Sequence, residues 1–280
     1  MAVTLPRLTE TLTTERITVA IRDLPLSLHG TTLVQLSDFH WDGQSLSPDL
    51  LEAAIAQCNT IQPDLVVLTG DFVTGRSHHI RPLVDHLQHL HSRLGTYAIL
   101  GNHDSSYFSR RRTITHALTA GGIQVLWNEI AYPLGEALPL VGLADLYSRR
   151  SSPTSRLQLL PDTLPRLVLA HNPDTMAELR SVRADLVLSG HTHGGQIKLP
   201  GLAPAPFYLN ALGAYVPTPL RRYVPFLKEE CDRVFQHWEW ASGLHRVGEN
   251  QLYVNRGLGS YWPGRWGCAP ELTVITLVTP

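Results

Sequence analysis

Aspartate, asparagine and histidine residues stand at the ends of five apolar segments of this 280-residue chain. Their donor atoms, oxygen and nitrogen, are those that bind transition-metal ions, and there are enough of them to hold two ions. The segments are LVQLSDFH (33–40), LVVLTGD (65–71), YAILGNHD (97–104), RLVLAH (166–171) and DLVLSGHTH (185–193). The polar residues at their ends are Asp38, His40, Asp71, Asn102, His103, His171, His191 and His193.

Two of these ends carry a pair of candidate ligands spaced by two residues. Asp38 and His40 form one pair, and His191 and His193 form the other. Residues i and i+2 share a face of a strand, so each pair could reach one ion. A lone DxH is more typical of a surface turn, whereas the run GHTHGG has few structural explanations. His171, alone before Asn-Pro, could be a hydrogen-bonded polar residue without a ligand role.

The remaining candidates have a structural alternative beside the functional one. Asp71 follows a glycine, as in many turns, but the apolar LVVLT places its carboxylate where open α/β sheets bind ligands. Asn102 could ligate through its side-chain carbonyl or begin a helix as its N-cap. Asp145, after another apolar segment, could support the ligands or occupy a plain turn.

The elements that would position these residues alternate between strands and helices, which predicts an α/β fold with largely buried sheets. Further strands are predicted at 16–22, 124–132, 138–145, 251–258 and 271–278, and helices at 48–60, 79–93, 113–120 and 174–180. Ser47 and Pro48 favour a helix start. The proline- and aromatic-rich segment 199–248 is too long for a simple connection. It predicts a cap or lid inserted into one domain, 1–280.

Two clusters are more typical of structure than of chemistry. The histidines of the 78–91 region follow no acidic or thiol pattern, which favours a solvated helix face; they are His78, His79, His86, His89 and His91. The aromatic residues of the insertion favour packing, or a cap that grips an apolar group or touches a membrane beside Arg221 and Arg222. These are Phe207, Tyr208, Tyr215, Tyr223, Phe226, Trp238 and Trp240.

Composition limits the partners and the compartment. The formal net charge is −1 and no basic run is long enough to follow a phosphate backbone, so no nucleic-acid partner is expected. Three distant cysteines, Cys58, Cys231 and Cys268, favour a reducing compartment. No secretion signal or 18-residue apolar span is evident. We therefore expect a cytoplasmic protein, with peripheral membrane contact through the insertion as an option.

The five blocks, DxH, GD, GNHD, H and GHxH in this order, resemble the calcineurin-like metallophosphoesterase superfamily. The ending NRGLG (255–259) and GRWGCAPEL (264–272) is similar to one bacterial branch of it, the YaeI/YkuE-like phosphodiesterases. The resemblance covers roughly residues 15–280 outside the insertion. It implies a sandwich of two mixed β-sheets flanked by helices, an enzyme, and a small-molecule phosphoester as substrate.

The resemblance also implies roles for the site residues. Asp71 would bridge two divalent ions, and His103 would protonate the leaving oxygen, oriented by Asp104. A metal-bridging hydroxide would attack phosphorus, and the mixed donors suit Mn, Fe or Zn. Asp38, His40 and His193 would hold one ion, and Asn102, His171 and His191 the other.

The expected reaction is hydrolysis of a phosphodiester or pyrophosphate bond, with a nucleotide-activated lipid precursor as one candidate substrate. The alternatives are a phosphomonoesterase or phosphoprotein phosphatase on the same metal core, a nuclease, and a non-catalytic scaffold of this fold. The filled ligand positions and His103 argue against the scaffold. The sequence assigns no substrate-binding residue and no oligomeric state.

Overall fold

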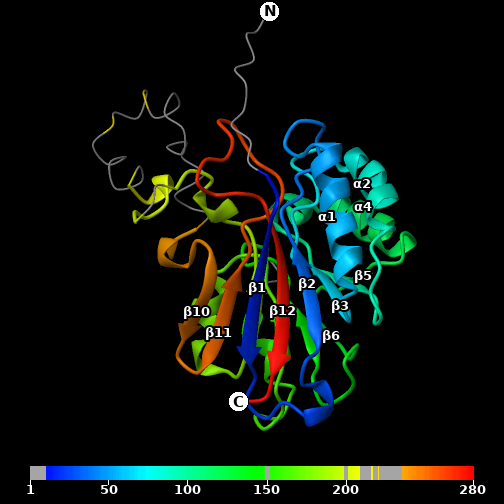
Figure 1. Cartoon of the computed structure of the whole chain (residues 1–280), viewed down its shortest axis with the longest axis vertical. Helices are drawn as coiled ribbons and strands as arrows, with labels where there is room; N and C mark the ends of the chain where they lie inside the picture. The colour runs from blue at the N-terminus through cyan, green and yellow to red at the C-terminus, as the bar shows by residue number, and fades with distance from the viewer. Residues whose placement is uncertain (1–10, 149–151, 199–200, 209–215, 217–219, 221–234) are drawn as a thin grey trace, which may run out of the picture.

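The computed structural model describes residues 11–148, 152–198, 201–208, 216, 220 and 235–280. Two six-stranded mixed sheets face each other, with helices on their outer faces (Figure 1). The predicted fold class is confirmed. Among the described residues, no helix is both long and apolar enough to cross a bilayer.

The first sheet has the order β1-β12-β2-β3-β4-β5. β2, β3, β4 and β5 run parallel, whereas β12 is antiparallel to β2 and parallel to β1. The N-terminal and C-terminal strands therefore lie side by side (Figure 1). The strands are β1 (Thr13–Ala20), β2 (Thr32–Leu36), β3 (Leu65–Leu68), β4 (Thr96–Ala98), β5 (Gln124–Val125) and β12 (Glu271–Val278).

The second sheet has the order β10-β11-β9-β8-β7-β6. Its four central strands are parallel to their neighbours, and β10 and β6 are antiparallel edges. The strands are β6 (Glu129–Ala131), β7 (Leu140–Gly142), β8 (Leu167–Leu169), β9 (Leu186–Ser189), β10 (Gly243–Val247) and β11 (Asn250–Val254). The α-helices that lie wholly within the described residues are α1 (Pro48–Ile61), α2 (Ile80–Leu87), α3 (Asn102–Ser105), α4 (Phe108–Ala120), α5 (Pro153–Leu157) and α6 (Thr175–Glu178).

Both faces of each sheet are buried, which explains the continuous apolar runs of its strands. In β3, Leu65 and Val67 face the second sheet, whereas Val66 and Leu68 face the helices α1, α2 and α4. A separate apolar cluster covers the outer face of the second sheet with α5, α6, Phe235 and Trp240. α1 begins as predicted, with Ser47 Oγ accepting a hydrogen bond from Leu50 N.

Several predicted boundaries are wrong. The segment 124–132 is not one strand: β5 and β6 belong to different sheets, and the chain crosses between them at Asn128, whose φ is 55°. α2 is shorter than predicted and α4 begins earlier. The segment 199–248 contains β10, so its last residues belong to the second sheet. Residues 209–215, 217–219 and 221–234 of the expected cap, with Arg221 and Arg222, lie outside the described residues.

Candidate functional site

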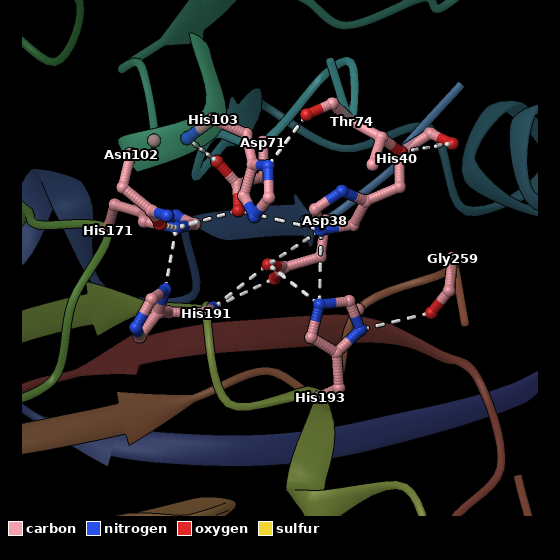
Figure 2. A network of polar contacts seen from close by, with 12 residues as sticks. Asp38, His40, Asp71, Thr74, Asn102, His103, His171, His191, His193 and Gly259 are labelled. Carbon is pink, nitrogen blue, oxygen red and sulfur yellow. Dashed lines mark hydrogen bonds and ion pairs between the residues drawn. The ribbon is translucent and has the colours of Figure 1, made fainter. Parts of the chain in front are cut away.

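The candidate site lies at the carboxyl ends of parallel strands from both sheets. The loops after β2 and β3 carry Asp38, His40 and Asp71, and the short helix α3 after β4 carries Asn102 and His103. The segments after β8 and β9 carry His171, His191 and His193. Their side chains point toward one another (Figure 2). Three groups have donor atoms within 4.8 Å of one another: Asp38–His40–His193, His40–Asp71–His103 and Asp71–His171–His191.

The backbone, more than strand alternation, aims these side chains. β2 ends at Leu36 and β9 at Ser189, so neither i, i+2 pair lies on a strand, and the prediction that strand geometry aligns each pair is wrong. Five of the nine described non-glycine residues with positive φ are Asp38, His40, Asp71, His191 and His193. Each such conformation costs about 1–3 kcal/mol and is typical of functional sites. The fold therefore stabilises strained loops here.

Two glycines let the loops approach closely. A Cβ at Gly101 would collide with the Asp71 carboxylate, and a Cβ at Gly190 would collide with Ser37 Oγ and Asp38 Oδ2. Any larger residue at either position would have to displace a candidate ligand. Gly101 therefore lets two neighbouring segments of the first sheet meet, and Gly190 lets the two sheets approach each other.

Asp71 occupies the centre of the site. Its Oδ2 lies 3.5 Å from His40 Nε2 and 3.2 Å from His171 Nε2, and its Oδ1 accepts a hydrogen bond from His103 N at 3.0 Å. Burial raises the pKa of this carboxyl, but the nearby His171 and His103 outweigh that effect and hold the pKa well below its usual range. Asp71 is therefore an anion placed between two groups of imidazoles.

Backbone carbonyls fix the orientation of three imidazoles. The Nδ1 atoms of His171, His193 and His103 lie 2.7, 3.1 and 2.7 Å from the carbonyl oxygens of Thr69, Gly259 and Thr74. A carbonyl only accepts, so each Nδ1 carries the proton and Nε2 faces the site. This partner arrangement is common for metal-ligating histidines. Imidazole nitrogens with carboxylate and amide oxygens fit first-row divalent ions.

The charges within the site are uneven. Burial lowers the pKa of His40 to about 3. Burial also lowers the pKa of His171, but Asp71, Asp38 and Asp145 outweigh it and raise that pKa to about 10. Burial raises the pKa of Asp38 to about 6. At neutral pH the metal-free site therefore holds a proton on His171, while His40 is neutral.

Asp104 does not orient His103, which corrects the expected role. Its buried carboxylate accepts hydrogen bonds from the backbone N–H groups of Phe72, Val73 and Gly101. Thr74 contacts the His103 ring instead. Asp104 therefore joins the loop that carries Asp71 to the loop that carries His103.

Asp145 lies in a turn and also affects a candidate ligand, so both alternatives predicted for this residue apply. Its Oδ2 accepts a hydrogen bond from Tyr147 N, as in an Asx turn, and its Oδ1 has no hydrogen-bond partner among the described residues. The residue is 2% exposed, and burial raises the pKa of its carboxyl to about 6. It also acts electrostatically on His171.

Tyr261 also reaches the site, although no sequence pattern predicted a role for it. Its hydroxyl lies 2.7 Å from His40 Nδ1 and 3.4 Å from His103 Nε2. Gln196 and Arg265 hold the loop that carries it. Sequence reasoning could have found it in the glycine-rich stretch 255–267, where Tyr261 directly follows NRGLGS and is the one residue with a phenolic hydroxyl.

The two clusters outside the site can be followed only in part, because Tyr215, Tyr223 and Phe226 lie outside the described residues. Within the described residues, none of the five histidines of the 78–91 region belongs to a group that could hold a metal. Trp240 is buried in the outer core of the second sheet and Trp238 packs against it. Phe207 and Tyr208, by contrast, are 47% and 41% exposed.

Comparison with known proteins identifies the family of this chain. Residues 31–195 match the calcineurin-like phosphoesterase family. The chain is 35% identical to "Phosphodiesterase YaeI" of Escherichia coli, over 87% of this chain and 80% of that protein. It is 29% identical to "UDP-2,3-diacylglucosamine pyrophosphatase LpxG" of Chlamydia trachomatis, over 89% and 84% of the two chains.

The solved structure of TT1561 of Thermus thermophilus shares the fold. Its TM-score is 0.50 at 11% identity, covering 82% of this chain and 90% of that one. The family match, the similar relatives and the candidate ligand groups lead to one assignment. The chain belongs to the calcineurin-like phosphoesterase family and is a phosphoric ester hydrolase.

Proposed function

We propose that this protein hydrolyses a phosphodiester or pyrophosphate bond with two divalent transition-metal ions, Mn, Fe or Zn. Asp38, His40 and His193 would hold one ion and Asn102, His171 and His191 the other. Asp71 would be shared. The central observation is the place of the Asp71 carboxylate, within 3.5 Å of an imidazole nitrogen of each set. Two cations held by these neighbouring ligand sets would repel each other, so they would need an anion shared between them.

The chain's own residues divide the remaining work. The bound ions would lower the pKa of an attacking water and neutralise charge on the phosphoryl oxygens. Thr74 holds the proton of His103 on Nδ1, so Nε2 faces the reacting group, where it can deliver a second proton to the leaving oxygen. His103→Ala should therefore lower the rate by about 10²–10⁴-fold and leave the metal content unchanged.

The substrate class is supported by a relative. The LpxG sequence named above is that of a UDP-2,3-diacylglucosamine pyrophosphatase, which favours a nucleotide-activated lipid precursor. The side chains of Trp262 and Trp266, in the Tyr261 loop, and of Phe207 are about half exposed, which supports contact with an acyl chain or a membrane surface. We extend the proposal to a cytoplasmic enzyme that can contact the membrane surface through these side chains. Flotation with liposomes should fall in a Trp262→Ser/Trp266→Ser variant; unchanged flotation would contradict this contact.

The test is a substrate panel at one Mn²⁺ concentration. It compares bis-p-nitrophenyl phosphate, p-nitrophenyl phosphate and UDP-2,3-diacylglucosamine. We expect turnover of the diester and the pyrophosphate, and its loss in His191→Ala but not in His89→Ala, an exposed control. Preference for the monoester would favour a phosphomonoesterase. Binding of two ions without turnover of any substrate would favour the non-catalytic scaffold.

A further inference from the structure

The Tyr261 hydroxyl is a polar group of the site that no candidate ligand set uses. It lies 2.7 Å from His40 Nδ1, 3.1 Å from His40 Nε2 and 3.4 Å from His103 Nε2. Its ring packs at an angle of 60° to the His40 ring, with centroids 4.7 Å apart. The hydroxyl therefore lies between a candidate metal ligand and the candidate proton donor.

The loop that carries Tyr261 is fixed from several sides. Tyr261 N donates to Gln196 Oε1 at 2.6 Å, and Gly259 N donates to Asp38 O at 2.7 Å. The buried Arg265 guanidinium donates to the carbonyl oxygens of Arg256, Gly257 and Gly259 at 2.7, 3.0 and 2.6 Å. Fixed positions of this kind are what a substrate-contacting group needs.

The donors and acceptors around Tyr261 limit where its hydroxyl proton can point. When a cation occupies His40 Nε2, the neutral ring carries its proton on Nδ1. The Tyr261 oxygen lies 2.7 Å from Nδ1 and 3.1 Å from Nε2, so it sits beside the ring and out of line with the Nδ1–H bond. With one nitrogen on the cation and the other protonated, His40 offers the Tyr261 O–H no lone pair to accept it. The Tyr261 O–H is then free to donate elsewhere, and it lies on the side of His103 Nε2.

We propose that the Tyr261 hydroxyl donates a hydrogen bond to a non-bridging oxygen of the substrate phosphoryl group, beside His103. This inference rests on the proposed function. In this role Tyr261 is a catalytic residue that contacts the phosphoryl group, and the loop 259–267 is its support. Product phosphate would bind through the same hydroxyl.

The test compares wild type, Tyr261→Phe and the control Tyr132→Phe, an exposed tyrosine, at saturating Mn²⁺. Metal content, the Kd of inorganic phosphate by calorimetry, and kcat/KM for aryl phosphodiesters with a range of leaving-group pKa values are measured. We expect two ions in all three proteins. A hydrogen bond to a charged group is worth about 1.5–3 kcal/mol, so phosphate binding and kcat/KM should weaken by about 10- to 100-fold in Tyr261→Phe alone.

The outcomes separate this inference from the proposed function. Equal phosphate affinity in wild type and Tyr261→Phe would overturn the contact, even if the enzyme is active. A steeper dependence on leaving-group pKa in the variant would move the contact to the leaving oxygen and also overturn it. A charge-transfer band of the iron-loaded wild type that the variant lacks would make Tyr261 a ligand instead. A wild type without turnover or phosphate binding would contradict the proposed function itself.

Discussion

The two sheets contribute different chemistry to the site. The loops of the first sheet supply both aspartates, the amide of Asn102 and two imidazoles, whereas those of the second sheet supply the imidazoles of His171, His191 and His193. Two of the three candidate ligand groups combine residues of both sheets. The comparison teaches that the proposed metal centre depends on the packing of one sheet against the other.

The imidazoles also differ in whether they are charged before a cation binds, and this difference does not follow the sheets, because burial also holds the pKa of His193 well below its usual range. His40 of the first sheet is neutral at pH 7 because burial lowers its pKa. His171 of the second sheet keeps its proton because it faces the carboxylates of the first sheet. In the metal-free protein this proton takes the place of a cation between the sheets.

Of these variants, Asp71→Asn should have the largest effect on the proposed metal centre, which residues of both sheets form. The amide removes the charge shared by His40 and His171. Removing a residue that hydrogen-bonds to a metal ligand typically lowers metal affinity by about 10–100-fold. Removing the shared ligand itself should therefore lower activity by more than about 100-fold. Diesterase assays and metal analysis check this. Asp85→Asn, at an exposed position, is the control; near-normal activity in Asp71→Asn would contradict the shared role.

The pH dependence of metal binding should sharpen the contrast between His40 and His171. The pKa of His171 is raised to about 10, so between pH 7 and pH 10 an ion must displace its proton. Affinity should rise about 10-fold per pH unit for one released proton. Calorimetry in buffers of different ionisation enthalpy measures the release; binding without proton release at pH 7 would contradict it.

The raised pKa of His171 also predicts the direction in which the stability of the metal-free protein changes with pH. A histidine whose folded-state pKa lies above 6.5 stabilises the fold fully below pH 6.5. This contribution should be lost as the pH rises through about 10. Denaturant unfolding of the metal-free protein between pH 6.5 and pH 10 checks the direction, with His171→Gln removing the dependence.

Gly190→Ala should push the sheets apart locally. The new Cβ would collide with Ser37 Oγ and Asp38 Oδ2 of the opposite sheet. Such overpacking typically costs about 1–3 kcal/mol, and the shifted Asp38 should also weaken metal binding. Gly75→Ala, which has open space around it, is the matched control and should change stability by less than about 0.5 kcal/mol. Equal stability of the two variants would show that the loops can relax.

Gln35→Met should have the smallest effect. The buried Gln35 Nε2 donates to Ser189 O of the other sheet at 2.9 Å and to Thr69 Oγ1 at 3.0 Å. Ser189 O keeps its bond from Asn255 N, so the loss should be about 0.5–1.5 kcal/mol. The free energy of unfolding should fall by that amount, and activity should stay within a few-fold. A large loss of activity would mean that Gln35 positions the ligand loops.

The sequence predicted the elements best where one apolar run served one buried strand. The five strand ends, the start of α1 and the two mixed sheets agree with the structure. Prediction failed where the same apolar pattern served two sheets, as at 124–132. Local propensity does not say at which residue a chain leaves one sheet and enters the other.

The candidate site divides in the same way. Residue types and block order alone singled out the eight strand-end residues that the structure brings together, because donor chemistry is a property of the side chain. Only the tertiary structure decided that Asp104 binds backbone N–H groups, that carbonyls of distant loops fix the imidazoles, and that Tyr261 reaches the site. Those contacts join residues far apart in the chain, and the packing of two sheets determines which of them meet.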